Sequence, residues 1–591
     1  MTPTFSHIAF KQTWTRWALA FFLIAALLGL VMRSFHVMAM PAVLDYKNVL
    51  HTHSHLALLG WGYLMITGGI IFSLESAQVV IPKYRRLFLL ILISLIGMLV
   101  TFPVQGYGVW SISFSTLHVL VSYILAVRLL GTLRMQAVSL GIRLIQLAIG
   151  FQLISTLGLW ALGPVTVSLG RMHELYFMSI QWFLHFQLNG WFVLGTLGLL
   201  IYRVEQVRGV IHWSVFRIGV MILSVGLTYA LVITWAEPNP LFFTINAIAV
   251  GLQGMVYFWI FRALLQGVKG LELPKLVKLL IYAALISLTV KAILQLCLIL
   301  PSVAVISYSI RQFVIGFLHL VLLGIMSFGL GAVAMLNGDL SMERSSAAGW
   351  LVVISAFLST EILLFSQGLL LWLKLGFIPQ YHLLLFLFSI LFPLGLAILW
   401  ITQLENKSPN TSQLNLTSKN PNQNSTPSMK KSLIWSLGIL GILMTACAGG
   451  ESQNTASSTQ PEEATQQVKA DPKGIGEIKN VDLDESIDEN LVSTGKAIVD
   501  MKCTACHQLN DKRLVGPGFQ GVTNRRRPEW IMNMITNVDV MLDEDPVAQE
   551  LLAECLTRMP NQNISVGDAR GILEFLRKND LEKAGEKDGA L

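Results

Sequence analysis

Three short stretches share the pattern His-x-x-Leu-x-Gly: HLALLG (residues 55–60), HFQLNG (185–190) and HLVLLG (319–324). Each stretch lies inside an apolar run that is long enough to cross a membrane. Of the 591 residues, 54% are hydrophobic and only 13% are charged, whereas soluble proteins carry roughly 25% charged residues. The composition therefore predicts a membrane protein with three histidines inside it.

The apolar runs predict a fold of the all-α class. Because one span needs ~20 apolar residues, residues 14–402 accommodate about twelve transmembrane helices in a polytopic bundle. Lys and Arg are concentrated in the loops after the even-numbered spans, which predicts a cytoplasmic N-terminus. The formal net charge of +7 then reflects membrane topology and does not indicate nucleic-acid binding. The predicted spans are 14–35, 54–74, 86–105, 110–130, 142–163, 175–201, 212–235, 241–263, 276–300, 311–335, 349–373 and 381–402.

The composition changes after the last predicted span. Residues 403–428 are polar, rich in Asn and Ser, and predict a flexible cytoplasmic linker. Residues 429–447, MKKSLIWSLGILGILMTAC, have the basic start, apolar core and final cysteine of a bacterial lipoprotein signal, with lipidation expected at Cys447. The alternative is a thirteenth span. In both cases residues 448–484 lie outside, and their Glu, Gln, Thr and Ser content predicts a disordered periplasmic tether.

The segment KCTACH carries the clearest chemical signal. Cys503, Cys506 and His507 form Cys-x-x-Cys-His, the attachment motif of c-type haem. Two thiols on one helical turn can add to the two haem vinyl groups, and the next residue brings an imidazole to the iron. A chance match or half of a zinc site are the alternatives. A zinc site would need two more ligands, and only Cys555 is nearby.

Residues 485–580 resemble the small class I cytochromes c. The resemblance rests on a helix leading into the motif, the Gly516-Pro517 turn after it, and a closing helix. It implies one covalent haem c with a Met as the sixth ligand, which Met559 matches. The other methionines of this region are expected in the core: Met532, Met534 and Met541. The stretch GPGFQGVTNRRRPEWIMNMI (516–535) also resembles cytochromes encoded beside bacterial nitrous-oxide reductases.

The repeated histidines His55, His185 and His319 fall on predicted helices two, six and ten. In the order of these histidines along the chain and in their depth in the membrane, residues 14–402 resemble the catalytic subunit of haem–copper oxidases and nitric-oxide reductases. That resemblance implies three equivalent four-helix arcs, with a low-spin haem ligand on helix two. His55 is the best-placed candidate there, and His51 and His53 are the alternatives.

The same resemblance assigns roles on helices six and ten. It implies that His319 binds the low-spin haem from helix ten, while Phe317 stands where the high-spin haem ligand would be. His185 matches a copper or non-haem iron ligand, but helix seven lacks the adjacent pair of histidines that should complete that site. The chain therefore resembles a degenerate relative that holds one bis-histidine haem b without a complete reducing centre for oxygen or nitric oxide.

Other readings of the membrane histidines remain open. The HTHSH cluster, His51 to His55, could bind copper near the outer surface, and His118 is a further candidate at similar depth. Histidine and glycine also serve interhelical hydrogen bonds and close helix packing in membranes. Two charges inside the membrane, Lys291 and Glu361, indicate a proton path, a quinol site or a mutual ion pair.

These features predict a multi-pass protein of a bacterial inner membrane, with its cytochrome in the periplasm. We expect respiratory electron transfer from the quinol pool or another membrane donor to a periplasmic redox partner protein, with a nitrous-oxide reductase as the candidate acceptor. The first rival is an enzyme, an oxidoreductase of the terminal oxidase or nitric-oxide reductase type. The second is a membrane part that only anchors the cytochrome or handles metal. Membrane lipid is expected as a partner, and nucleic acid is not.

Overall fold

The computed structural model describes two stretches of the chain. They are residues 3–405 and 471–590, without 39, 42, 76, 170–173, 237–238, 374, 377, 505, 514–515, 556–558 and 560–563. The predicted lipoprotein signal with Cys447, most of the linker and the first part of the tether lie outside the described residues.

Twelve helical spans among the described residues are long and apolar enough to cross a membrane, which confirms the predicted bundle. Among the described residues, eight spans are single helices, and three contain a π-helical segment. Helices α9 and α10 together make the seventh span, and α13 is a short helix between the ninth and tenth. The helices of this part are α1 (Pro3–Ser34), α2 (Tyr46–His55), α3 (Tyr63–Leu74), α4 (Ala77–Gln105), α5 (Val109–Arg134), α6 (Leu140–Ser168), α7 (Glu174–His185), α8 (Val193–Arg208), α9 (Val215–Leu227), α10 (Ala230–Ala236), α11 (Pro240–Val268), α12 (Lys275–Cys297), α13 (Pro301–Ser309), α14 (Arg311–His319), α15 (Phe328–Leu336), α16 (Arg344–Trp372) and α17 (Tyr381–Glu405).

The three repeated motifs share a backbone feature. Immediately after His55, His185 and His319 the helix widens into a π-helical segment: η1 (Leu56–Gly62), η2 (Phe186–Phe192) and η3 (Leu320–Ser327). π-helical turns are rare and often lie at functional sites. Their recurrence at the same point of spans two, six and ten shows that the sequence repeat is also a structural repeat.

Spans two, six and ten form the centre of the bundle, because they are its three most buried spans. They pack against one another at small residues. The indole N–H of Trp61 donates to the hydroxyl of Ser327 over 2.8 Å. Gly62 lies against Phe192 and Met326, so closely that an added methyl group would overlap both side chains. Small residues at helix contacts allow this close approach within a membrane.

The second described stretch folds into a separate small domain. Its helices are α18 (Glu489–Lys502), α19 (Val522–Arg525), α20 (Pro528–Thr536), α21 (Val538–Glu544), α22 (Pro546–Cys555) and α23 (Val566–Ala584). Side chains of Asp488 and Ser565 cap α18 and α23 by accepting backbone N–H groups of the first turn, as helix N-termini require. The first and last helices cross where Gly495 meets Gly571, and a Cβ on Gly495 would lie 1.9 Å from the Gly571 carbonyl oxygen.

The small domain begins earlier than the sequence indicated. Residues 471–487 form turns, bends and irregular backbone, and Ile475, Ile478 and Val481 pack against the domain core. The side chain of Asn533 ties this segment down by donating to the carbonyl groups of Lys473 and Ile478 over 3.1 and 2.9 Å. The part of the predicted tether from 471 onwards therefore belongs to the folded domain.

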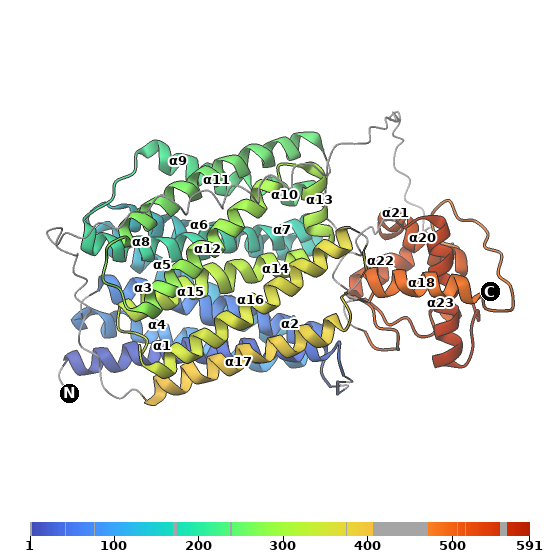
Figure 1. The fold of residues 1–591 in the computed structure, drawn as a ribbon, viewed down its shortest axis with the longest axis horizontal. Helices are drawn as coiled ribbons and strands as arrows, with labels where there is room; N and C mark the ends of the chain where they lie inside the picture. Colours follow the sequence, from blue (N-terminus) through green and yellow to red (C-terminus); the bar gives the residue numbers. More distant parts are fainter. Residues whose placement is uncertain are drawn as a thin grey trace, which may run out of the picture.

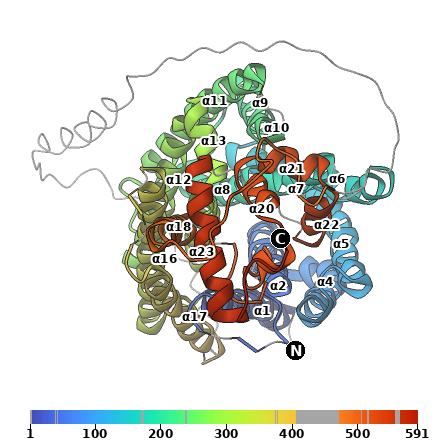
Figure 2. The same ribbon diagram turned by 90° about the vertical axis from the view of Figure 1, so that its right-hand side faces the viewer.

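The small domain sits against one end of the helical bundle, opposite the end where the chain begins (Figure 1). We call this the cytochrome end, because it carries the segment that resembles cytochromes c. Seen along the bundle, α20 and α23 lie over the inner helices, and α18 lies over the side formed by α16 (Figure 2). Helices α2, α7 and α14, which carry the repeated histidines at their last residues, approach this same end (Figure 1).

Candidate haem sites

The cysteines of the KCTACH motif lie at the end of α18. Cys503 follows the last helical residue, and its carbonyl group accepts the backbone N–H groups of Cys506 and His507 over 3.0 and 2.9 Å. This tight turn brings the two thiols and the imidazole to one side of the backbone. Both cysteines are free and partly exposed, so both thiols are available for covalent attachment.

The imidazole of His507 is held in one orientation. Its Nδ1 lies 2.8 Å from the Pro517 carbonyl oxygen, to which it donates, and the ring stacks on Phe519 with centroids 4.5 Å apart. A side chain at Gly516 would overlap the ring. Burial lowers the pKa of His507, which favours the neutral imidazole that binds iron. A metal-binding histidine usually donates its second N–H in this way, and Nε2 remains for the metal.

The methionines of the domain fall into two groups. Met532 and Met541 are buried in the core, and the Met541 sulfur accepts the Ile475 N–H over 3.0 Å, so it already has a partner. Met534 packs at the edge of the core, and so does Met559, which is half-buried. The role of Met559 as the sixth haem ligand stays a prediction. Of the alternative methionines, Met532 and Met541 are already packed in the core.

Comparison with known proteins identifies the family of this domain. Residues 492–580 match the family model for cytochrome c. Among solved structures, cytochrome c from Rhodothermus marinus is 39% identical, with 19% of this chain and 96% of that chain covered and a TM-score of 0.18. An engineered cytochrome c from Rhodothermus marinus, Rma TDE, is 38% identical, with 19% and 98% covered and a TM-score of 0.18. No curated protein matches the chain.

The family match and the geometry agree. Residues 492–580 are a cytochrome c domain, and Cys503, Cys506 and His507 fit the covalent attachment of haem c. The described residues contain no group of three or more His, Cys, Asp or Glu side chains that could hold a metal ion, so they offer no complete zinc site around the motif. The domain supports a haem-based electron-transfer role.

The haem-attachment motif faces the membrane bundle. The guanidinium of Arg311, the first residue of α14, donates to the Cys506 sulfur over 3.6 Å and to the Tyr46 hydroxyl over 3.2 Å. Arg311 and Cys506 are 195 positions apart in the sequence, and no sequence pattern predicted this contact. Three further hydrogen bonds join the two parts: Gln508 Nε2 to Phe35 O (3.3 Å), Lys512 Nζ to Met40 O (3.3 Å) and Lys47 Nζ to Glu554 O (3.5 Å).

In the membrane bundle, the structure brings His53 and His319 together. They are within electrostatic range of each other and of Arg33. His53 Nδ1 lies 2.7 Å from the Ala25 carbonyl oxygen. The ring of His53 lies against Gly29 of α1, where a Cβ would be 3.1 Å from Cε1. Of the helix-two histidines, His53 is the one within electrostatic range of His319, whereas the repeat favoured His55, and the choice of helix-two ligand stays a prediction.

The surroundings of His319 also fit a ligand. Its Nδ1 lies 3.8 Å from the Glu361 carboxylate, and neither this nitrogen nor the Glu361 oxygens have a hydrogen-bond partner among the described residues. A carboxylate beside the second nitrogen is a common partner of a metal-binding histidine. Because Nδ1 of His53 is bound to the Ala25 carbonyl oxygen, Nε2 of each residue remains for a metal, and both residues stay candidates for axial haem ligands.

His51, His55 and His118 lie on the side of the bundle formed by α4 and α5, away from His53. His55 packs against Phe102 and Tyr107, and His51 packs against Tyr107. His118 packs on Tyr63 and is within electrostatic range of His55. The HTHSH cluster is thus divided between the His319 side and the α4–α5 side. Within the described residues these side chains do not form a group of three or more metal ligands.

His185 stands apart from the His53–His319 pair. Its Nε2 lies 2.8 Å from the Val225 carbonyl oxygen of α9. This hydrogen bond engages the nitrogen that would otherwise be available to a metal near span seven. The Phe317 ring, where the resemblance implied a lost ligand, lies under the Lys291 ammonium at 5.5 Å. Lys291 and Glu361 have different partners: Lys291 donates to Tyr257 and Gln295, and Glu361 lies beside His319.

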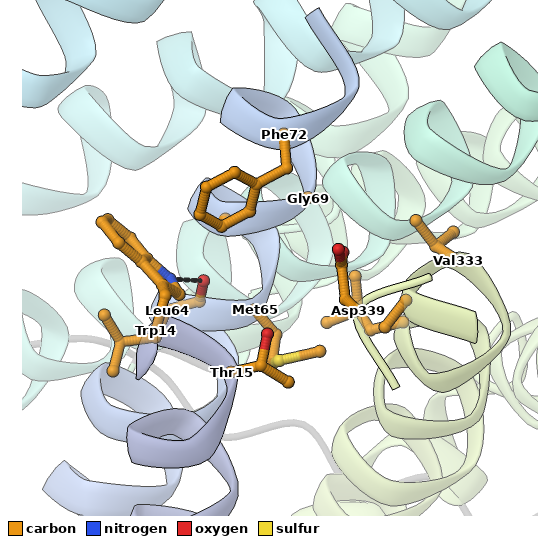
Figure 3. Close-up of a pocket in the computed structure, with 11 residues that line it drawn as sticks. Trp14, Thr15, Leu64, Met65, Gly69, Phe72, Val333 and Asp339 are labelled. Atoms are coloured by element: carbon orange, nitrogen blue, oxygen red, sulfur yellow. Dashed lines mark hydrogen bonds between the residues drawn. The ribbon is translucent and has the colours of Figure 1, made fainter. Parts of the chain in front are cut away.

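A small cavity lies at the other end of the bundle. It is lined by Trp14, Leu64, Phe72 and Asp339, among others, and Trp14 Nε1 donates to the Leu64 carbonyl over 2.8 Å (Figure 3). Its volume of about 10 Å³ is near the minimum for one water molecule. This cavity cannot hold a quinol ring, and it is lined by none of the candidate histidines.

Proposed function

We propose that this chain is a membrane-bound electron-transfer protein of a respiratory chain. Electrons would pass from a donor in the membrane, such as quinol, to a periplasmic acceptor protein, with a nitrogen-oxide reductase as the candidate acceptor. Cys503, Cys506, His507 and Met559 would hold haem c, and His53 and His319 would hold haem b. Both groups, when bound, supply one-electron oxidation and reduction of iron.

The contact between Arg311 and Cys506 carries this proposal. Arg311 begins α14 and His319 ends it, so the two side chains start about 12 Å apart along one helix. The same helix thus touches the haem-attachment motif and presents a candidate haem ligand inside the membrane. An anchor with no redox role would have no need of this arrangement.

The terminal reductase is the weaker candidate, for reasons of side-chain placement. Such a centre needs a second haem ligand near the Phe317 position and two histidines from span seven. Phe317 is covered by Lys291, the described residues of span seven hold no histidine, and His185 is bound to a backbone carbonyl. Copper at the HTHSH cluster is also disfavoured, because His53 faces away from His51 and His55.

A reduced-minus-oxidised spectrum of the purified full chain, recorded before and after carbon monoxide, tests the proposal. We expect signals of haem c and low-spin haem b that carbon monoxide leaves unchanged. A haem b that binds carbon monoxide would support the reductase. Haem c without haem b would support the anchor. The His319→Ala variant should lose the haem b signal and keep haem c.

A further inference from the structure

A row of polar side chains runs along the contact between α11 and α12. Asn246, Gln253 and Tyr257 lie on one face of α11, because they are seven and four residues apart. At the cytochrome end, Asn246 Nδ2 donates to the Leu298 carbonyl at the end of α12 over 3.0 Å. Deeper in the bundle, the Tyr257 hydroxyl accepts from Lys291 Nζ of α12 over 3.0 Å.

Lys291 is the deepest polar member of this row. Its side chain is 0% exposed, and it donates to the Gln295 amide oxygen over 2.5 Å as well as to Tyr257. The groups that face it from neighbouring elements are Tyr257 of α11, Phe317 of α14 and, at longer range, His185 of α7. Its hydrogen bonds and ring contacts among the described residues are with neutral groups. A lysine in such surroundings can exchange its proton without breaking an ion pair.

Two residues of the row have polar atoms without partners. Both side-chain atoms of Gln253 and the Oδ1 of Asn246 lack a hydrogen-bond partner among the described residues, although each residue is only 1% exposed. Buried polar groups in this state are usually satisfied by ordered water. Gln253 and Tyr257 are about 6 Å apart along the helix axis, a distance that one water molecule can bridge. Asn246 and Gln253 are about 10 Å apart, a distance that two water molecules can bridge.

The polar row extends from Lys291 and Tyr257 toward the cytochrome end only. Beyond Tyr257, the same face of α11 continues with Ile260 and Leu264, which are buried and apolar. The facing part of α12 continues with Leu288 and Ala284, which are also buried. Among the described residues, the side-chain hydrogen bonds between α11 and α12 are those of Asn246 and Lys291, and none lies beyond Lys291 and Tyr257.

We propose that water enters along Asn246 and Gln253 from the cytochrome end and that Lys291 is the proton-exchange site at the end of this path. The ligands are water and hydronium: hydronium gives a proton to the Lys291 amine and leaves water, and the reverse step returns the proton. Glu361 is not part of this path, since it lies beside His319. The inference does not depend on haem b, because it rests on the α11–α12 contact alone.

Cysteine labelling of the full chain in lipid vesicles tests the path. In a Cys297→Ser background, Gln253→Cys should react with a cationic methanethiosulfonate reagent added on the cytochrome side. Ile248→Cys is the matched control, since Ile248 lies on the same helix, nearer that end, but is exposed at the surface of the bundle. Labelling of Gln253→Cys alone supports the path. Labelling of neither variant, or of both, would overturn it.

A measurement on the unaltered chain removes any effect of the substitutions. X-ray hydroxyl-radical footprinting oxidises aromatic rings that lie next to water. Tyr257 is buried and Phe258, its neighbour at the same depth, is 59% exposed on the outer surface of the helix bundle, where lipid lies. We expect oxidation of Tyr257 to exceed that of Phe258 several-fold. An unmodified Tyr257 would contradict the proposal, whatever the haem content of the protein.

Discussion

The cytochrome c domain and the membrane bundle hold their candidate haem ligands in different ways. In the small domain, two cysteines and a histidine lie within five residues, and one turn of backbone presents them together. In the bundle, His53 and His319 come from spans far apart in the sequence, and only packing brings them together. A ligand set fixed by local geometry can be recognised from sequence, whereas one fixed by packing must be seen in the fold.

The largest effect is expected at the local site. Replacing both Cys503 and Cys506 by serine removes both thioether attachments, so covalently bound haem should disappear. Haem-stained denaturing gels measure this directly. The matched control is Cys297→Ser, since Cys297 is a free, exposed cysteine of α12, and it should keep the full signal. Covalent haem in the double variant would contradict the assignment of the motif.

The identity of the haem b ligand on helix two can be tested by comparing the His53→Ala and His55→Ala variants. Of the two, only His53 is within electrostatic range of His319, and His55 packs on Phe102 and Tyr107. We expect His53→Ala to lower haem b affinity by more than the ~10–100-fold typical of outer partners of a metal site, and His55→Ala to retain haem b. Haem b content at equal haem c measures the difference. The opposite result would restore His55 as the helix-two ligand.

The packing of the small domain gives the next largest effect. Gly495→Ala inserts a methyl group against the Gly571 backbone, where a Cβ would be 1.9 Å from the carbonyl oxygen. Overpacking of this kind costs about 1–3 kcal/mol, so the domain should unfold at lower denaturant concentration. The control is Gly567→Ala, whose new methyl group would lie no closer than 3.9 Å to a neighbour. Equal stability of the two variants would show that α18 and α23 cross differently.

The smallest effect is expected from an ion-pair network at the end of the small domain. Burial alone would raise the pKa of Glu574, but hydrogen bonds from Arg570, the Asp488 N–H and Arg577 outweigh it and lower the pKa. The pKa of Asp588 is lowered in the same way, by Arg577 and Lys587. Because both folded-state pKa values lie below the unfolded ones, the stabilisation is present at neutral pH.

That stabilisation is lost as the pH falls through the folded-state pKa values. Stability of the domain should therefore decline below about pH 4, the unfolded range of Glu and Asp, and Glu574→Gln should flatten this decline. Acid titration followed by the haem absorbance measures it. The control is Lys578→Gln, because the Lys578–Glu489 pair is at the surface and such pairs contribute little. An equal effect of both variants would argue against the buried network.

The fold and the cytochrome motif could be predicted well because their signals are local. Each span is a continuous apolar run, and Cys-x-x-Cys-His is a complete chemical unit within one turn. The periodicity of His55, His185 and His319 also correctly marked the three central helices, which each widen into a π-helical segment after the histidine.

The membrane site could be predicted only in part. Three histidines at alternate positions, 51, 53 and 55, point to opposite helix faces, and the choice between them depends on where α1 and α14 pack. Residue 311 begins the tenth predicted span, and no sequence pattern indicated that Arg311 contacts Cys506. Lys291 and Glu361 could equally have formed an ion pair, and the fold instead gives each its own partners. The start of the small domain at 471 was missed because its residues have no helical period.

The most direct test of the account is the haem stoichiometry of the purified full chain, measured by the pyridine haemochrome method. A domain with one attachment motif and a bundle with one His53–His319 pair should give one haem c and one haem b per chain. Haem c alone would mean that His53 and His319 serve the packing of the bundle, and the proposed path of electrons out of the membrane would be wrong.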